Sequence, residues 1–329
     1  MRKLECLKVT HSYDGVYNAL CRVSLTVEAG QVLALIGPNG AGKSTTLRIL
    51  ATLQRPDAGE VLWDGRDAWA ARYEVRRRVG FLGDGTAVYP GMTAAGYLRF
   101  FAECYGMRDA VAEVRVHELL EQFELMGKAS ARISDLSKGM RQRVAIARTL
   151  VHSPELLLLD EPADGLDPSA RRRLREILRQ TADAGVAIVI SSHVLRELDG
   201  FCDTVALIRG GELELFGGVT EVIDRYEVRR RVHELEVWRG LDRAIEVLER
   251  HRGLIEEVVR TPVVEGEGAG GQGVARDGGR IRVRVHGEVD APARLLKELV
   301  DADVEILAMH KVRGDLEDVY RSIGRDEAS

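Results

Sequence analysis

A glycine-rich segment that ends in lysine, serine and threonine is the first part of this sequence whose residue types and spacing point to chemistry. It follows directly on the apolar run 32–36 and consists of Gly37, Pro38, Asn39, Gly40, Ala41, Gly42, Lys43, Ser44 and Thr45. Glycines let backbone N–H groups converge on phosphate oxygens, and a helix beginning near Gly42 adds the positive end of its dipole. We expect Lys43 to reach the β- and γ-phosphates and Ser44 to bind Mg²⁺. The pattern predicts a site for a nucleoside triphosphate with magnesium.

Two consecutive carboxylates offer the other half of a phosphoryl-transfer site. Asp160 and Glu161 follow the apolar run 156–159. Ligands of open α/β sheets bind at the carboxyl ends of strands, so Asp160 is placed to meet the magnesium ion. Glu161 reaches the same site and is a candidate general base for an attacking water. The alternative interpretation is that these two acidic residues only terminate a strand. The glycine loop upstream favours the catalytic interpretation.

The apolar runs before these residues predict the sheet that must position them. Residues 32–36, 156–159 and 187–190 are short continuous apolar runs, which is typical of strands buried on both faces. An amphipathic pattern over 170–184 predicts a helix between the last two runs, and strand, helix and strand form a parallel crossover unit. The first domain, residues 1–217, is therefore predicted to be α/β.

A helical insert is predicted inside this domain. From Thr93 to Ser130 apolar residues recur at spacings of three and four, and we place the whole insert at about residues 88–152. Near its end, residues 136–143 place Ser137 and Gly139 at the start of an arginine-rich helix, where a hydroxyl and exposed N–H groups form an anion site. The alternative for this segment is a surface helix that is capped by serine and binds no anion.

Residues 136–143 also resemble the signature sequence of the ATP-binding subunits of ATP-binding-cassette (ABC) transporters. With the glycine loop upstream, the resemblance covers roughly residues 4 to 217. It implies a P-loop ATPase cassette with ATP and Mg²⁺ as its cofactors. It also implies a head-to-tail dimer with a second copy of the chain, in which each ATP lies between the glycine loop of one copy and Ser137 and Gly139 of the other.

Further roles are implied by the resemblance, residue by residue. Asp167 matches the loop that communicates between the two ATP sites, in trans. His193, which follows the next buried strand, matches the histidine that contacts the γ-phosphate and orients the lytic water. Tyr13 matches the aromatic residue on which adenine stacks. The implied catalytic set is therefore Glu161, His193 and Lys43.

One position departs from the family pattern. Asp84 stands where the family usually has the glutamine that contacts Mg²⁺ and water. A carboxylate can still ligate magnesium, together with Ser44 and Asp160, but it adds negative charge beside the phosphates. We expect an altered turnover or metal preference.

Past residue 217 the character of the sequence changes. The predicted order is strand, helix, strand, strand, helix, strand, which is the ferredoxin-like β-α-β-β-α-β order of a small α+β domain over residues 218–329. Its glycine-rich segment 265–279 is predicted to be a flexible loop rather than an interdomain linker, because either side alone is too small for a core. A role as a small-molecule sensor or a dimerisation module is compatible with this domain, and the sequence does not specify its role.

Composition limits the functions that remain. The chain has 329 residues, a net charge of −5 and four scattered cysteines, and its longest apolar runs are far below the roughly 20 residues of a membrane span. No secretory signal pattern is present. We expect a cytoplasmic protein, peripheral on the inner face of the membrane through a separately encoded permease.

The resemblance favours an exporter subunit over the other classes. The single cassette and the C-terminal segment, including 315–320, resemble the exporter branch that serves drugs, lipids, polysaccharides or sodium ions. The alternative is an ABC ATPase that acts on ribosomes or nucleic acid without a membrane partner. Arg280, Arg282 and Arg284 alternate along one strand, and Arg229 to Arg231 add three more, yet a solvated sheet face explains them better than nucleic-acid binding.

Overall fold

The structure is a computed structural model of the chain. It describes residues 1–83, 88–193, 200–223, 231–250, 255–260, 278–285 and 291–311. Contacts divide the chain into two compact units, Met1–Val219 and Thr220–Ser329, which are taken in turn below. Within the described ranges, every helix is too short or too polar to cross a bilayer.

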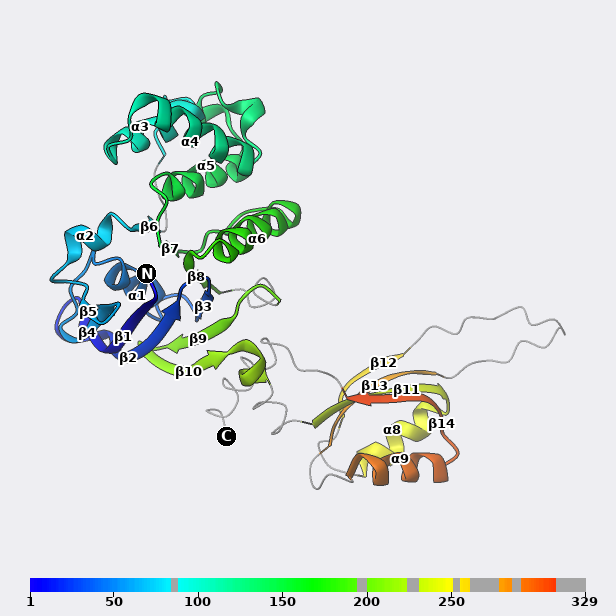
Figure 1. Ribbon diagram of the computed structural model, residues 1–329. Helices are drawn as coiled ribbons and strands as arrows, with labels where there is room; N and C mark the ends of the chain where they lie inside the picture. The colour runs from blue at the N-terminus through cyan, green and yellow to red at the C-terminus, as the bar shows by residue number, and fades with distance from the viewer. Residues whose placement is uncertain are drawn as a thin grey trace. The chain divides into compact units, whose positions relative to one another are not determined.

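A six-stranded sheet forms the centre of the first unit (Figure 1). Its order is β10-β9-β3-β8-β7-β6, and all neighbours are parallel except the antiparallel pair β10 and β9. The strands are β3 (Val32–Ile36), β6 (Val79–Leu82), β7 (Leu156–Leu159), β8 (Ala187–Ser192), β9 (Thr204–Arg209) and β10 (Glu212–Gly218). Every residue of β3, β7 and β8 is buried, as their continuous apolar runs predict. The predicted α/β class is confirmed.

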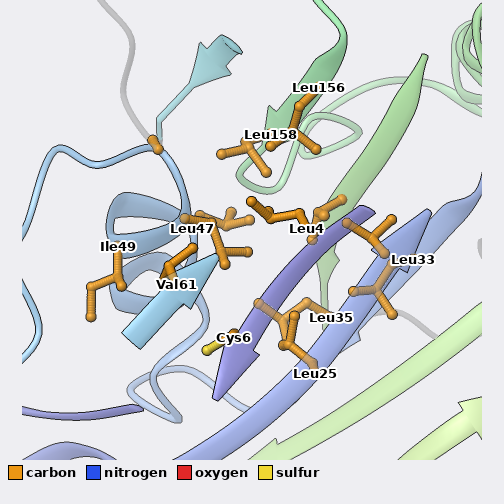
Figure 2. Packing of buried hydrophobic residues seen from close by; sticks show 14 of the residues in the cluster. Leu4, Cys6, Leu25, Leu33, Leu35, Leu47, Ile49, Val61, Leu156 and Leu158 are labelled. Carbon is orange, nitrogen blue, oxygen red and sulfur yellow. The ribbon is translucent and has the colours of Figure 1, made fainter. Parts of the chain in front are cut away.

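A second, antiparallel sheet packs within the same core. Its order is β2-β1-β4-β5, made of β1 (Lys3–Ser12), β2 (Asn18–Glu28), β4 (Ala58–Trp63) and β5 (Arg66–Asp67). Figure 2 shows how Leu4 and Cys6 of β1 meet Leu33 and Leu35 of β3 and Leu47 in one apolar cluster. The strand β2 begins at Asn18, where its pairing with Ser12 of β1 starts.

The helices of the first unit fall into two groups (Figure 1). The helices α1 (Lys43–Leu50), α2 (Arg72–Arg76) and α6 (Pro168–Asp183) are connected directly to the strands of the central sheet. The predicted insert contains α3 (Ala94–Cys104), α4 (Asp109–Gln122), α5 (Lys138–Leu150) and the short 3₁₀ turns Met126–Lys128 and Ile133–Asp135. The helix α6 begins two residues before the predicted start, because proline is favoured in a first helical turn.

The second unit is a sheet with two helices on one face (Figure 1). The strand order is β12-β13-β11-β14, and all pairs are antiparallel. Its elements are β11 (Arg231–Arg239), α8 (Leu241–Glu249), β12 (Ile255–Arg260), β13 (Gly279–Val285), α9 (Ala291–Asp301) and β14 (Glu305–Lys311). The element sequence is β-α-β-β-α-β. The predicted loop 265–279 lies outside the described residues except for its last two, as does the segment 315–320.

Candidate functional site

The glycine loop lies between β3 and α1 and is held there by close backbone approaches. A Cβ added to Gly37 would lie 2.2 Å from the carbonyl oxygen of Ile208, and one added to Gly42 would lie 2.5 Å from that of Ala19. Gly42 also has a φ of 108°, a left-handed conformation that favours glycine. Both ends of the loop therefore require glycine, as the sequence pattern predicts.

Lys43 is the first residue of α1, and its side chain turns back over the loop. It is buried, and its Nζ donates hydrogen bonds to the carbonyl oxygens of Gly37 at 2.7 Å and Pro38 at 3.2 Å. A buried ammonium must be paired to be stable. The loop thus holds the lysine at the position where phosphate oxygens are expected.

Three predicted catalytic residues meet at the carboxyl ends of β3, β7 and β8. Glu161 Oε1 lies 3.2 Å from Lys43 Nζ, and Glu161 Oε2 lies 2.9 Å from His193 Nδ1. The order β3-β8-β7 of parallel strands places these ends at one edge of the sheet, where ligands of such sheets bind. Residues that are far apart in sequence therefore form one cluster.

Asp160 and Glu161 are held by a residue that the sequence analysis missed. Ser191, the fifth residue of β8, is fully buried, and its hydroxyl donates to Asp160 Oδ1 at 2.6 Å. The Ser191 hydroxyl oxygen also accepts a hydrogen bond from the backbone N–H of Glu161 at 2.8 Å. Glu161 has a φ of 46°, which is uncommon outside glycine and marks local strain. Ser191 therefore holds the carboxylate of Asp160 and the backbone of Glu161.

The residues expected to hold magnesium supply hard oxygen ligands. Ser44 is in the first turn of α1 and is half-buried, and Asp160 is buried at the end of β7 with one carboxylate oxygen bonded to Ser191. Mg²⁺ prefers one or two such protein ligands together with phosphates and water, so these residues fit the ion. Asp84, the third expected ligand, lies outside the described residues.

The signature residues begin their own helix. Ser137 is the N-cap of α5, and its hydroxyl accepts from Met140 N at 3.2 Å. A Cβ added to Gly139 would meet only Leu166 Cδ2, at an ordinary 3.5 Å. Packing within the chain therefore does not require glycine at residue 139. The cluster of Lys43, Glu161 and His193 forms without these two residues.

Asp167 also caps a helix. Its carboxylate accepts from Ser169 N, Ala170 N and the Ser169 hydroxyl at the start of α6, at 3.0, 3.0 and 2.6 Å. The Ser169 hydroxyl, followed by the Ala170 N–H, lowers the pKa of this carboxyl below its ordinary value. Asp167 is therefore an ionised, well-oriented cap at the beginning of α6.

Tyr13 lies one residue past β1, and 61% of it is exposed. Its hydroxyl is 3.1 Å from Thr45 Oγ1, so it is close to the first turn of α1, which directly follows the glycine loop. Burial raises the pKa of Tyr13, but hydrogen bonds to Thr45, Arg48 and Gln54 outweigh it and the pKa is lowered overall. The ring is thus anchored at its hydroxyl while much of its surface is open.

Comparison with known proteins identifies relatives of the chain. Residues 20–164 match the protein-family model described as "ABC transporter". The chain is 37% identical over 227 residues to "ABC transporter ATP-binding protein NatA" of Bacillus subtilis (strain 168), covering 69% of this chain and 91% of that protein. It is 38% identical over 223 residues to "Nod factor export ATP-binding protein I" of Cupriavidus pinatubonensis, covering 67% and 68%. Relatives in the same range include an ATP-binding protein named for sulfate/thiosulfate import.

A solved structure of an ATP-binding cassette has a fold similar to that of this chain. The chain matches the dimeric structure of a post-hydrolysis state of the ATP-binding cassette MJ0796 bound to ADP and Pi, with a TM-score of 0.60 and 27% sequence identity. The match covers 65% of this chain and 98% of that one. The predicted cassette fold is confirmed by this similarity.

Proposed function

The chain belongs to the ABC transporter family as one of its ATP-hydrolysing subunits, and on this basis we propose a role for each residue of the site. Lys43 binds the β- and γ-phosphates with the backbone N–H groups of the glycine loop. Glu161 accepts the proton of the attacking water, and His193 donates a hydrogen bond to the γ-phosphate. The observation that carries this proposal is the contact of Glu161 with both Lys43 and His193.

Ser44 and Asp160 are proposed to hold the magnesium ion, which when bound neutralises charge on the phosphates. Ser191 keeps Asp160 oriented through the 2.6 Å hydrogen bond. The carboxylate of Glu161 now pairs with Lys43, so the incoming γ-phosphate takes over that ammonium and releases Glu161 to act as a base. Most of the rate gain then comes from positioning and charge stabilisation.

A second copy of the chain completes each site in this proposal. Ser137, Gly139 and, through its loop, Asp167 are proposed to act on the ATP bound by the other copy. Two observations support this: Gly139 is free of any packing constraint that would require glycine, and the related cassette of known structure is dimeric. A helix N-terminus with glycine in its first turn allows close approach of a phosphate.

The partner is proposed to be a separately encoded permease in the cytoplasmic membrane, with the chain on its inner face. A groove in the first unit is lined by exposed or half-buried aromatic and basic side chains, including Phe81, Phe101, Tyr105 and Arg148. The ring of Tyr89, which is 49% exposed, packs on Phe101 beside it. Aromatic and arginine side chains are enriched at protein interfaces, which supports permease docking here.

Export is the proposed direction, and the relative named for Nod factor export supports it. The competing role on ribosomes or nucleic acid depended on free arginines, but Arg280 lies 3.2 Å from Glu236 and Arg282 lies 3.2 Å from Glu234. Each of these two arginines therefore has a carboxylate beside it, which lowers the local positive charge offered to a phosphate backbone. Arg229, Arg230 and the side chain of Arg284 lie outside the described part of the structure.

Co-expression with the permease encoded by a neighbouring gene tests this assignment. We expect the chain to sediment with membranes only when the permease is present, and to confer ATP-dependent loss of a substrate from loaded cells. Uptake in place of loss would make it an importer. Recovery with ribosomal RNA and no membrane association would favour the soluble alternative.

A further inference from the structure

A continuous set of hydrogen-bonded polar side chains connects Tyr13 to His11 of β1. The Tyr13 hydroxyl lies 3.1 Å from Thr45 Oγ1, 3.2 Å from Gln54 Oε1 and 3.4 Å from an Arg48 guanidinium nitrogen. Gln54 Nε2 is hydrogen-bonded to His11 Nε2. Thr45 and Arg48 belong to α1, Gln54 follows it, and His11 belongs to β1. Tyr13 is therefore tied to the helix that follows the glycine loop.

The chemistry of these groups sets the direction of each hydrogen bond. A guanidinium only donates and an amide oxygen only accepts, so Tyr13 accepts from Arg48 and gives its single O–H hydrogen to Gln54. Thr45 then donates to the second lone pair of the Tyr13 oxygen. Since the Gln54 amide nitrogen donates to His11 Nε2, the imidazole proton is on Nδ1.

Asp57 supports this arrangement against its reverse. His11 Nδ1 lies 3.3 Å from Asp57 Oδ2, so a protonated Nδ1 faces a carboxylate. If the Gln54 amide were turned around, His11 would donate from Nε2 and present the lone pair of Nδ1 to that carboxylate, which is repulsive. For a neutral imidazole, the orientation in the structure avoids this repulsion, and His11 Nδ1 faces Asp57 at contact distance without a hydrogen bond.

The same residues fix the plane of the tyrosine ring. His11 is 7% exposed, and its ring packs edge-on against Tyr13 with centroids 5.0 Å apart and planes at 85°. One end of the phenol is held by hydrogen bonds and one side by the buried imidazole. A flat, exposed ring surface remains, next to the first turn of α1.

We propose that Gln54 and Arg48 are positioning residues for nucleobase recognition, because they hold the Tyr13 hydroxyl and thereby preorganise its ring as the stacking surface. This inference rests on the proposed role of Tyr13 as the adenine platform. Through Thr45, the network also ties the base platform to the loop that binds the phosphates. A fixed ring loses less conformational entropy when the base binds.

The test compares MgATP with magnesium tripolyphosphate, which lacks a nucleoside, by titration calorimetry on the full-length chain. The variants are Gln54→Met, Tyr13→Phe and their combination. We expect Gln54→Met to bind ATP about fivefold more weakly, the typical effect of one lost hydrogen bond. Tyr13→Phe removes a hydroxyl with three hydrogen-bond partners and should weaken ATP binding at least as much, and both variants should keep the parent affinity for tripolyphosphate. The combined variant should lose no more than Tyr13→Phe alone, because both changes break the same bond.

Gln31→Met is the matched control. Its amide oxygen accepts a hydrogen bond from Glu28 N in the turn between β2 and β3, away from Tyr13, so both affinities should stay at the parent value. Parent-like ATP affinity in Gln54→Met, or an equal loss for both ligands, would overturn the positioning role. Tyr13→Ala tests the platform role of Tyr13 separately from the positioning role of Gln54 and Arg48. If this variant keeps the parent ratio of the two affinities, the platform role of Tyr13 itself falls.

Discussion

Ser191→Ala is the substitution from which the structure predicts the clearest double effect. Its hydroxyl is fully buried, donates to the Asp160 carboxylate at 2.6 Å and accepts from the Glu161 N–H at 2.8 Å. Alanine removes both hydrogen bonds and leaves a buried carboxylate oxygen and a buried amide without a partner. Stability and catalysis should therefore fall together.

The expected magnitude follows from the two bonds. A hydrogen bond to a charged group contributes about 1.5–3 kcal/mol and a neutral one about 0.5–1.5 kcal/mol, so the loss is about 3 kcal/mol in the free energy of unfolding. For a unit of this size, that lowers the melting midpoint by roughly 10 °C. ATP hydrolysis should drop at least about tenfold, since the strained backbone of Glu161 is no longer held in place.

Thermal unfolding by circular dichroism and phosphate release measure the two effects. Thr181→Val is the matched control, because it also removes a buried hydroxyl, one that donates only to Ile177 O within α6 at 2.8 Å. It should cost about 1 kcal/mol and leave hydrolysis unchanged. If Ser191→Ala melts within 1 °C of the parent and hydrolyses ATP at the parent rate, the proposed role of Ser191 is wrong.

Two further predictions concern Asp84 and His152. Asp84→Gln restores the usual family residue and should retain ATP hydrolysis. Activity below about a tenth of the parent rate would show that Asp84 does not simply take the place of the family glutamine. Burial, opposed by a hydrogen bond to Val79 O and assisted by Arg148 and Arg115, lowers the pKa of His152 to about 4. The unfolded chain binds this proton more readily, so stability present above pH 6.5 is lost as pH falls towards 4. The loss is about 2 kcal/mol between pH 7.5 and 5, and His152→Gln should abolish that part of the slope in urea titrations; an unchanged slope would contradict it.

The glycine loop and the paired carboxylates could be predicted because local sequence determines them. Gly42 has a φ of 108°, which is a local requirement for glycine, and a buried apolar strand before Asp160 places that residue at the edge of the sheet. The α/β class followed from the same runs. Such features depend on short-range sterics and on hydrophobic pattern, both of which a single sequence contains.

Contacts set by strand register could not be predicted in the same way. Ser191 reaches Asp160 only because β7 and β8 are parallel neighbours with Leu159 opposite Ile190. The pairing of Arg282 with Glu234 likewise follows from the alignment of β13 with β11. Its only sequence signal was the alternation of charges on two strands, which does not specify the partner.

The measurement that tests the central claim most directly is hydrolysis and oligomeric state of Glu161→Gln with MgATP. Glutamine keeps the shape of the side chain but cannot accept the proton of water. If Glu161 is the general base, this variant binds ATP at parent affinity, loses steady-state phosphate release and forms a stable ATP-bound dimer by light scattering. Continued turnover at a rate near that of the parent, with a monomer in the presence of ATP, would contradict it.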